Sequence, residues 1–186
     1  EEPVPIHDAA AVAKEVRYGH TIDTQAILIT VKEDLDAETL VKADTPRPAG
    51  GTVTVLKAMT VVEVPAGIYT YHQLASAFLR RGDLGLVKLT VGSQEWCGNT
   101  YRAWRLAAGK IQLRGESYFD GEALVQAEVP AGAVFLDTLP IWLRGLDLTA
   151  PQQRPLDLVG TQIANRVREP AVEKATVRLL GKTAGG

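Results

Sequence analysis

Residues 101–119 read YRAWRLAAGKIQLRGESYF, a stretch in which apolar and polar side chains alternate. Trp104 and Leu106 alternate with charged neighbours in its first half, and Ile111 and Leu113 alternate with polar neighbours in its second half. An alternation with a period of two is typical of a β-strand with one buried face. The stretch therefore predicts two half-buried strands in succession.

The connections around these strands are short. Ala108-Gly109 fits a tight hairpin between them, and Asp120-Gly121 fits a second hairpin after them. Asp-Gly favours a type I′ turn, which needs a positive φ at both central residues. Short links make neighbouring strands antiparallel. With apolar alternation also at 87–91 and 124–129, residues 84–129 predict a four-stranded meander.

Strand patterns continue outside the meander. The same alternation recurs over residues 27–31, 53–61 and 172–180. We therefore expect a mainly β fold, built as a curved antiparallel sheet or half-barrel with one or two short helices packed on it.

The first candidate helix contains Leu74, Ala77 and Phe78, whose spacing places them on one face. Gly82 is placed to end it. Arg80-Arg81 lies at its expected C-terminus, where positive charge is favourable in itself. The same pair could also meet a phosphate or an acidic lipid head.

The second candidate helix covers residues 137–146. Asp137 is expected to cap it, and Pro140 falls in the first turn, where proline is tolerated. Its apolar residues recur at helical spacing and are Leu139, Trp142, Leu143 and Leu146. A short helix with one apolar face is expected to pack on the sheet.

Length and composition limit the function classes. The chain has 186 residues with 46% hydrophobic residues, which predicts one β-rich domain over residues 1–180 and a flexible tail at 181–186. A net charge of −2 argues against binding to nucleic acid. No apolar run is long enough for a transmembrane segment. The single cysteine, Cys97, excludes an internal disulfide and argues against a zinc site.

The densest chemistry lies in Ser93-Gln94-Glu95-Trp96-Cys97-Gly98-Asn99-Thr100. In one interpretation Cys97 is a nucleophile, with His72 as its base and Asn99 orienting that base; His7 and His20 fit the role of base less well. In the alternative, which we favour, Cys97 is a small buried hydrophobe. We expect Trp96 to be a core anchor and Gly98 to serve a bulge or turn.

Glu95 offers a second catalytic interpretation. Beside Trp96 it could act as an acid in an apolar pocket, paired with a second carboxylate from Glu33, Glu63 or Glu116. A solvated strand glutamate is the alternative that we favour. His7, His20 and Asp23 lack the spacing of a metal site, so we predict neither a metal nor a cofactor.

Several strings occur in an order that resembles an uncharacterised bacterial family of exported or lipoprotein-type envelope proteins, over about residues 9–145. The most specific is Gln94-Glu95-Trp96-Cys97-Gly98. The weaker strings are Arg17-Tyr18-Gly19, Val31-Lys32-Glu33-Asp34, Val41-Lys42, Val55-Leu56-Lys57, Gly67-Ile68-Tyr69-Thr70-Tyr71 and Ser117-Tyr118-Phe119.

The resemblance implies an exported, periplasmic or envelope-associated β-protein, and it implies no mechanism. Similar proteins often carry histidine where this chain has Asn99, which weakens a local Cys–His pair. The further C-terminal strands expected from the resemblance would be shortened in this chain.

Three functions follow from these patterns. The first, which we favour, is a non-enzymatic carrier that binds a lipid or another apolar molecule between sheet and helix. Its lining residues would be Trp104, Leu106, Phe135, Leu139, Trp142 and Leu143, each of which could equally be core. The second is a hydrolase-like enzyme that uses Cys97 or Glu95. The third is a structural module that meets another envelope protein through a sheet edge or the Tyr69/Tyr71 patch.

Overall fold

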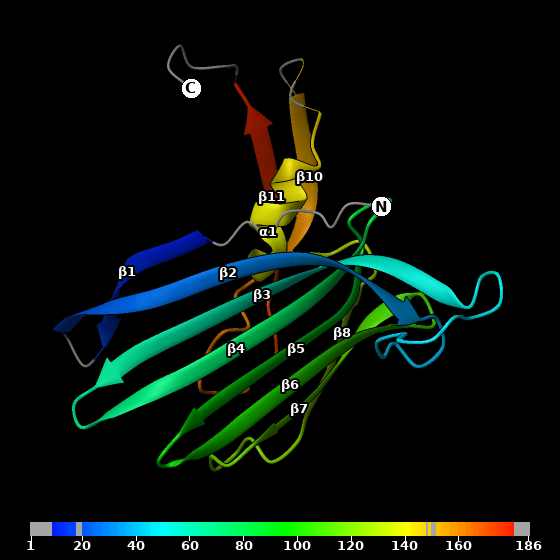
Figure 1. Ribbon diagram of the computed structural model, residues 1–186. Helices are drawn as coiled ribbons and strands as arrows, with labels where there is room; N and C mark the ends of the chain where they lie inside the picture. The colour runs from blue at the N-terminus through cyan, green and yellow to red at the C-terminus, as the bar shows by residue number, and fades with distance from the viewer. Residues whose placement is uncertain (1–8, 18–19, 148, 150–151, 181–186) are drawn as a thin grey trace.

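A computed structural model describes residues 9–17, 20–147, 149 and 152–180. The chain is mainly β, as the sequence predicts. Eight strands form one antiparallel sheet in sequence order, with β1 and β8 at its edges, and the sheet is curved (Figure 1). These strands are β1 (Ala9–Arg17), β2 (His20–Asp36), β3 (Thr52–Ala66), β4 (Tyr69–Arg80), β5 (Leu86–Glu95), β6 (Gly98–Ala107), β7 (Lys110–Ser117) and β8 (Val125–Pro130).

A smaller unit follows the large sheet. It consists of β9 (Val134–Phe135), a 3₁₀ turn (Leu136–Thr138), helix α1 (Leu139–Arg144), β10 (Gln152–Val159) and β11 (Val172–Leu179). β10 pairs antiparallel with β11 and parallel with β9. In Figure 1, α1, β10 and β11 rise from one side of the large sheet. No helix in the described part of the chain is long and apolar enough to cross a bilayer.

The predicted meander of 84–129 is confirmed as β5 to β8. Ala107 pairs with Lys110, and the two residues between them, Ala108 and Gly109, have φ values of +49° and +77°. Positive φ at both positions is the geometry of a type I′ hairpin. The short turn fixes the register that places Trp104 opposite Leu113.

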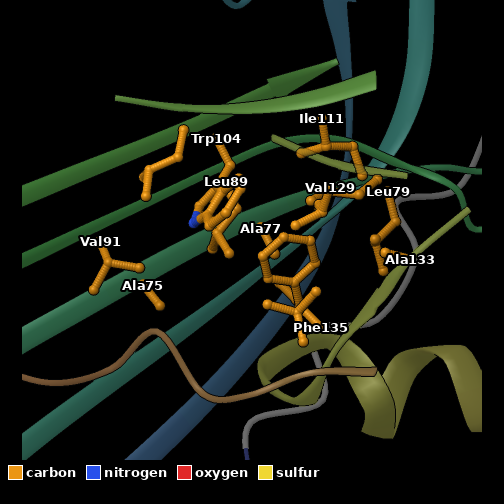
Figure 2. Packing of buried hydrophobic residues seen from close by; sticks show 14 of the residues in the cluster. Ala75, Ala77, Leu79, Leu89, Val91, Trp104, Ile111, Val129, Ala133 and Phe135 are labelled. Carbon is orange, nitrogen blue, oxygen red and sulfur yellow. The ribbon is translucent and has the colours of Figure 1, made fainter. Parts of the chain in front are cut away.

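The main core lies between the large sheet and the smaller unit. Trp104 is fully buried and meets the Phe135 ring edge-on, with centroids 5.0 Å apart. Figure 2 shows the two rings among the alternate, inward-facing residues of the neighbouring strands. Those residues include Ala75, Ala77, Leu79, Leu89, Val91, Ile111 and Val129. Burial of aromatic and branched side chains on one sheet face is the main source of stability here.

A second, smaller apolar cluster lies on the opposite face of the sheet. It contains Leu35, Leu40, Val55, Phe78 and Val87. The turn after β2 holds Leu40 in place: the Asp36 carboxylate accepts hydrogen bonds from the backbone N–H groups of Glu38 and Thr39 at 3.1 and 2.9 Å. Both faces of the central strands are therefore covered in part.

The helix predicted at Leu74, Ala77 and Phe78 is wrong, because these residues lie in strand β4. β4 pairs with β3 on one side and β5 on the other, so its backbone groups are bonded across the sheet. Its burial alternates: Ala75 and Ala77 are buried, whereas Leu74 is exposed. The helical spacing of three apolar residues was a coincidence that tertiary pairing overrides.

The tight hairpin predicted at Asp120-Gly121 is also wrong. β7 ends at Ser117 and β8 begins at Val125, so the connection is longer than a two-residue turn. Gly121 has a φ of +78°, but Asp120 is not in the positive-φ region. The buried carboxylate of Glu122 shapes this connection, because it accepts a hydrogen bond from the Ser117 hydroxyl at 3.0 Å.

The helix predicted after Asp137 is present in a shorter form, as α1. Its N-cap residue is Thr138, not Asp137, and Thr138 makes no side-chain capping bond. The Asp137 carboxylate instead accepts hydrogen bonds from the Thr161 hydroxyl at 2.6 Å and the Gln162 N–H at 2.8 Å. Desolvation by burial raises the pKa of Asp137, although these bonds oppose the effect. The residue ties α1 to the segment after β10.

Candidate functional site

A groove of about 540 Å³ lies where α1 approaches the large sheet. It is bounded by α1 and the residues just after it, the β4–β5 connection, and single residues of β2, β3 and β10. Its volume falls in the usual range for small-molecule sites. Its lining includes Leu56, Leu84, Trp142, Leu146, Arg81 and Arg144.

The floor of the groove is apolar. Leu56, Leu84 and Ile141 belong to the main core or pack against it, and Trp142 and Leu146 are half-buried beside them. Leu84 packs tightly on the end of α1: a methyl group added at Gly145 would lie only 2.3 Å from its Cδ1. A side chain at position 145 would therefore require the end of the Leu84 side chain to move.

The rim of the groove is rich in arginine. Arg81, Arg144 and Arg154 line it together with one carboxylate, Asp83. In the described part of the chain, neither Arg81 nor Arg144 forms an ion pair. Asp83 is already taken by Arg80, through two hydrogen bonds of 2.9 Å.

The Asp83–Arg80 pair also shapes the loop. The hydrogen bonds from Arg80 hold the pKa of Asp83 below its usual range, so the carboxylate stays charged and bound. It accepts a further bond from the Gly85 N–H at 3.0 Å. The rim therefore presents positive charge above an apolar floor, an arrangement that suits an anionic group carried on a hydrocarbon.

Sequence analysis placed one residue, Trp142, in this groove. Trp104 and Phe135 are fully buried and pack on each other in the core. Leu139 is half-buried and Leu143 is exposed, and neither lines the groove. Leu106 lines a separate hollow beside Leu40 and Val53.

Residues 160–167 cover part of the inner face of β6 and β7. The Trp104 indole N–H donates to the Gln162 Oε1 at 3.1 Å. Arg102, only 3% exposed, donates from Nη1 to the carbonyl oxygens of Gln162 and Ala164. Burial lowers the pKa of Arg102, and the nearby Glu122 and Asp137 charges oppose that effect. The chain itself thus fills this part of the face.

Glu122, in the β7–β8 connection, also binds residues 160–167. Its carboxylate accepts hydrogen bonds from the Arg166 Nε at 2.6 Å and the Val167 N–H at 2.8 Å. Burial works to raise the pKa of Glu122, but these hydrogen bonds outweigh it and leave the pKa below its usual value. Val167 in turn lies against Gly115, where an added methyl group would come within 2.5 Å.

The motif at 93–100 forms the tip of the β5–β6 hairpin. Glu95 pairs with Gly98, so Trp96 and Cys97 are the two turn residues. The interpretation of Trp96 as a core anchor is wrong, because it is 74% exposed. The interpretation of Cys97 as a buried hydrophobe is wrong for the same reason. A hairpin tip extends beyond the sheet, so the core cannot reach these side chains.

Gly98 serves this turn, as expected. Its φ is +155°, and a methyl group added there would lie 2.3 Å from the Tyr118 ring. Both the backbone conformation and the close approach of Tyr118 call for glycine.

The candidate catalytic residues gather only in part. His72, Gln94, Glu95 and Trp96 line one shallow hollow, whereas Cys97 is not among its lining residues. His72 faces Glu63, with 3.4 Å between Nδ1 and Oε1. No described hydrogen bond joins Cys97 to a histidine, and His7 lies outside the described residues. No group of three or more metal-ligating side chains occurs in the part that the structure describes.

Two residues of the groove, Trp142 and Arg81, had been singled out from the sequence. Arg81 was noted for its ability to meet an acidic head group, although on the wrong element. Leu84 and Arg144 carried no signal, because their importance comes from the approach of α1 to the β4–β5 connection. Arg102 was hidden in the same way, as one charged residue in an alternating strand. Comparisons with protein-family models, curated proteins and solved structures find no match for this chain.

Proposed function

We propose that this protein binds an anionic amphiphile of the fatty-acid class in the groove between α1 and the large sheet, and releases it unchanged. The observation that carries this proposal is an apolar floor beneath two arginines, Arg81 and Arg144, which form no ion pair in the described part of the chain, while the neighbouring carboxylate of Asp83 is paired with Arg80. A hydrocarbon chain would lie against Leu56, Leu84 and Trp142. Its acidic head would meet Arg81 and Arg144.

The chemistry of the rim favours an anion over a neutral lipid. A guanidinium presents several N–H donors in a planar fork that matches a carboxylate or a phosphate. Burial of the hydrocarbon supplies most of the affinity, and the arginines orient the ligand and select its charge. The resemblance described above implies that the protein is exported and acts in the cell envelope. The function of an amphiphile carrier fits that proposed location.

The proposal is tested by calorimetric titration with three ligands that share one chain: dodecanoate, dodecanol and dodecyltrimethylammonium. All three are used below their micelle-forming concentrations. We expect dodecanoate to bind most tightly, dodecanol more weakly, and the cationic compound weakest of all. The order follows from charge, since the three ligands offer the same chain to the floor.

The matched variants are Arg81→Glu/Arg144→Glu and, as a control, Arg114→Glu. Arg114 lies on β7, outside the groove, and pairs with Glu116. We expect the double variant to lose at least about tenfold in dodecanoate affinity, the loss of a charge-assisted hydrogen bond or more. The control should bind as the parent does. Equal binding of all three ligands, or equal losses in both variants, would overturn the proposal.

A further inference from the structure

A second hollow, of about 460 Å³, lies at the tips of the β3–β4 and β5–β6 hairpins. These tips lie at one end of the sheet, where strands β3 to β6 turn back (Figure 1). Its chemistry differs from that of the groove, because it combines an exposed indole and a half-buried tyrosine with amides, an imidazole and a carboxylate. We call it the tip pocket and define it by Tyr69, His72, Gln94, Glu95, Trp96 and Asn99.

Strand register produces a row of polar side chains in the tip pocket. His72 pairs with Gln94, and Gln94 pairs with Asn99 across the next strand. Residues directly opposite in antiparallel strands share a face, with Cβ atoms about 5 Å apart. All three side chains are exposed. The two amides form no side-chain hydrogen bond within the described residues, so their donors and acceptors are available to a ligand.

An aromatic wall stands beside this row. Trp96 stacks on Tyr69, with ring centroids 5.7 Å apart and 28° between the ring planes. Tyr69 also contacts Tyr71, at 5.5 Å between centroids. The Trp96 indole contacts the Tyr69 ring on one side and is still 74% exposed. An exposed indole face beside polar side chains is a surface on which a ligand ring can stack.

Glu95 adds a carboxylate without a partner. Its Oε2 is closed off from solvent and accepts no hydrogen bond in the described structure. A ligand in the pocket cannot reach this closed-off oxygen, so Glu95 contributes negative charge to the pocket and no hydrogen bond. Among the residues that line the pocket the only cationic candidate is His72, which already faces Glu63.

We infer that the tip pocket binds a saccharide, a neutral or amino sugar rather than an acidic one. The apolar face of a sugar ring would stack on Trp96, while ring hydroxyls would bond to the side-chain amides of Gln94 and Asn99. An aromatic face beside planar amides and one carboxylate matches a ring that is apolar on its faces and polar at its edge. The two carboxylates Glu63 and Glu95 disfavour acidic sugars through like-charge repulsion.

The test is saturation-transfer NMR on the intact chain with three disaccharides, built from N-acetylglucosamine, glucosamine and galacturonate. We expect transfer to the first two and none to the third. Trp96→Ala should weaken binding about tenfold, as loss of a stacked aromatic contact does. Asn99→Ala should weaken it about two- to tenfold, the range for one neutral hydrogen bond. Both residues are exposed, so the variants should stay folded.

Trp142→Ala is the matched control, since it removes an indole from the groove instead. It should leave saccharide binding unchanged, and Trp96→Ala should leave dodecanoate binding unchanged. The two proposals therefore fail independently. Absence of transfer to all three disaccharides, transfer to galacturonate alone, or equal losses in Trp96→Ala and Trp142→Ala would overturn the saccharide site.

Discussion

Replacing Trp104 by phenylalanine tests how residues 160–167 are held on the sheet. The substitution keeps an aromatic ring in the core and removes the indole N–H that donates to Gln162 Oε1 at 3.1 Å. Gln162 is buried, and its amide nitrogen is committed to the Gly160 carbonyl. Its side-chain oxygen would therefore be left without a donor.

The expected cost has two parts. A buried acceptor left unpaired costs about 1–3 kcal/mol. The smaller ring also leaves a gap beside Phe135, which costs about 1 kcal/mol. The free energy of unfolding should thus fall by about 2–4 kcal/mol. With a urea m-value of about 2 kcal/mol per molar, the unfolding midpoint should fall by about 1–2 M.

The assay is urea unfolding followed by far-UV circular dichroism, which does not depend on the tryptophan signal. Trp96→Phe is the matched control, because the same change at an exposed turn residue should alter stability by less than about 0.5 kcal/mol. Equal midpoints for Trp104→Phe and Trp96→Phe would refute the reasoning. They would show that residues 160–167 are not held on the sheet by this bond.

Three further predictions follow from single side chains. Gly98→Ala should lose about 1–3 kcal/mol of stability by thermal or urea unfolding, because the new methyl group collides with Tyr118. Gly132→Ala should leave stability unchanged, because nothing lies within 4 Å of a methyl group added there. Equal losses of stability in the two variants would contradict the predicted collision with Tyr118. The pKa of Glu122 is lower in the folded state than in the unfolded state. Its contribution to the free energy of unfolding is therefore fully present above the unfolded pKa of about 4.3, and it is lost as the pH falls through the lower folded pKa. Glu122→Gln should flatten the fall in urea midpoint below about pH 4.3, and an unchanged slope would refute this. Cys97 is exposed, so a thiol reagent should modify it fully without denaturant; protection in the native state would contradict the placement.

The meander could be predicted because its signals are local. Alternation in β6 and β7 and the Ala108-Gly109 turn are each contained within a few residues, and short connections leave antiparallel pairing as the simplest arrangement. At β4, in contrast, the local pattern led to a wrong prediction of a helix. Leu74, Ala77 and Phe78 have helical spacing, and only pairing with β3 and β5 shows that they belong to a strand.

The sites depended on contacts between distant parts of the chain. In the sequence, Arg102 is an ordinary strand arginine. In the structure its guanidinium donates to the carbonyl oxygens of Gln162 and Ala164, which are 60 and 62 residues away along the chain. The groove needs Leu84 against Gly145 in the same way. Trp96 shows the opposite error: a tryptophan in the motif between two strands was expected in the core, but the two-residue turn places it outside the sheet. The spacing of residues along the sequence does not show which distant residues are in contact.

The proposed function rests on where an anionic amphiphile binds, and photoaffinity labelling locates that site most directly. A dodecanoate analogue with a diazirine on its chain is bound to the intact protein, and the complex is irradiated. The labelled peptides are then identified by mass spectrometry. If the ligand lies in the groove, labels should fall on residues 81–84 and 141–146 and should be reduced by excess dodecanoate and by Arg81→Glu/Arg144→Glu. Labels confined to the hairpin tips, or labels that excess dodecanoate does not reduce, would contradict it.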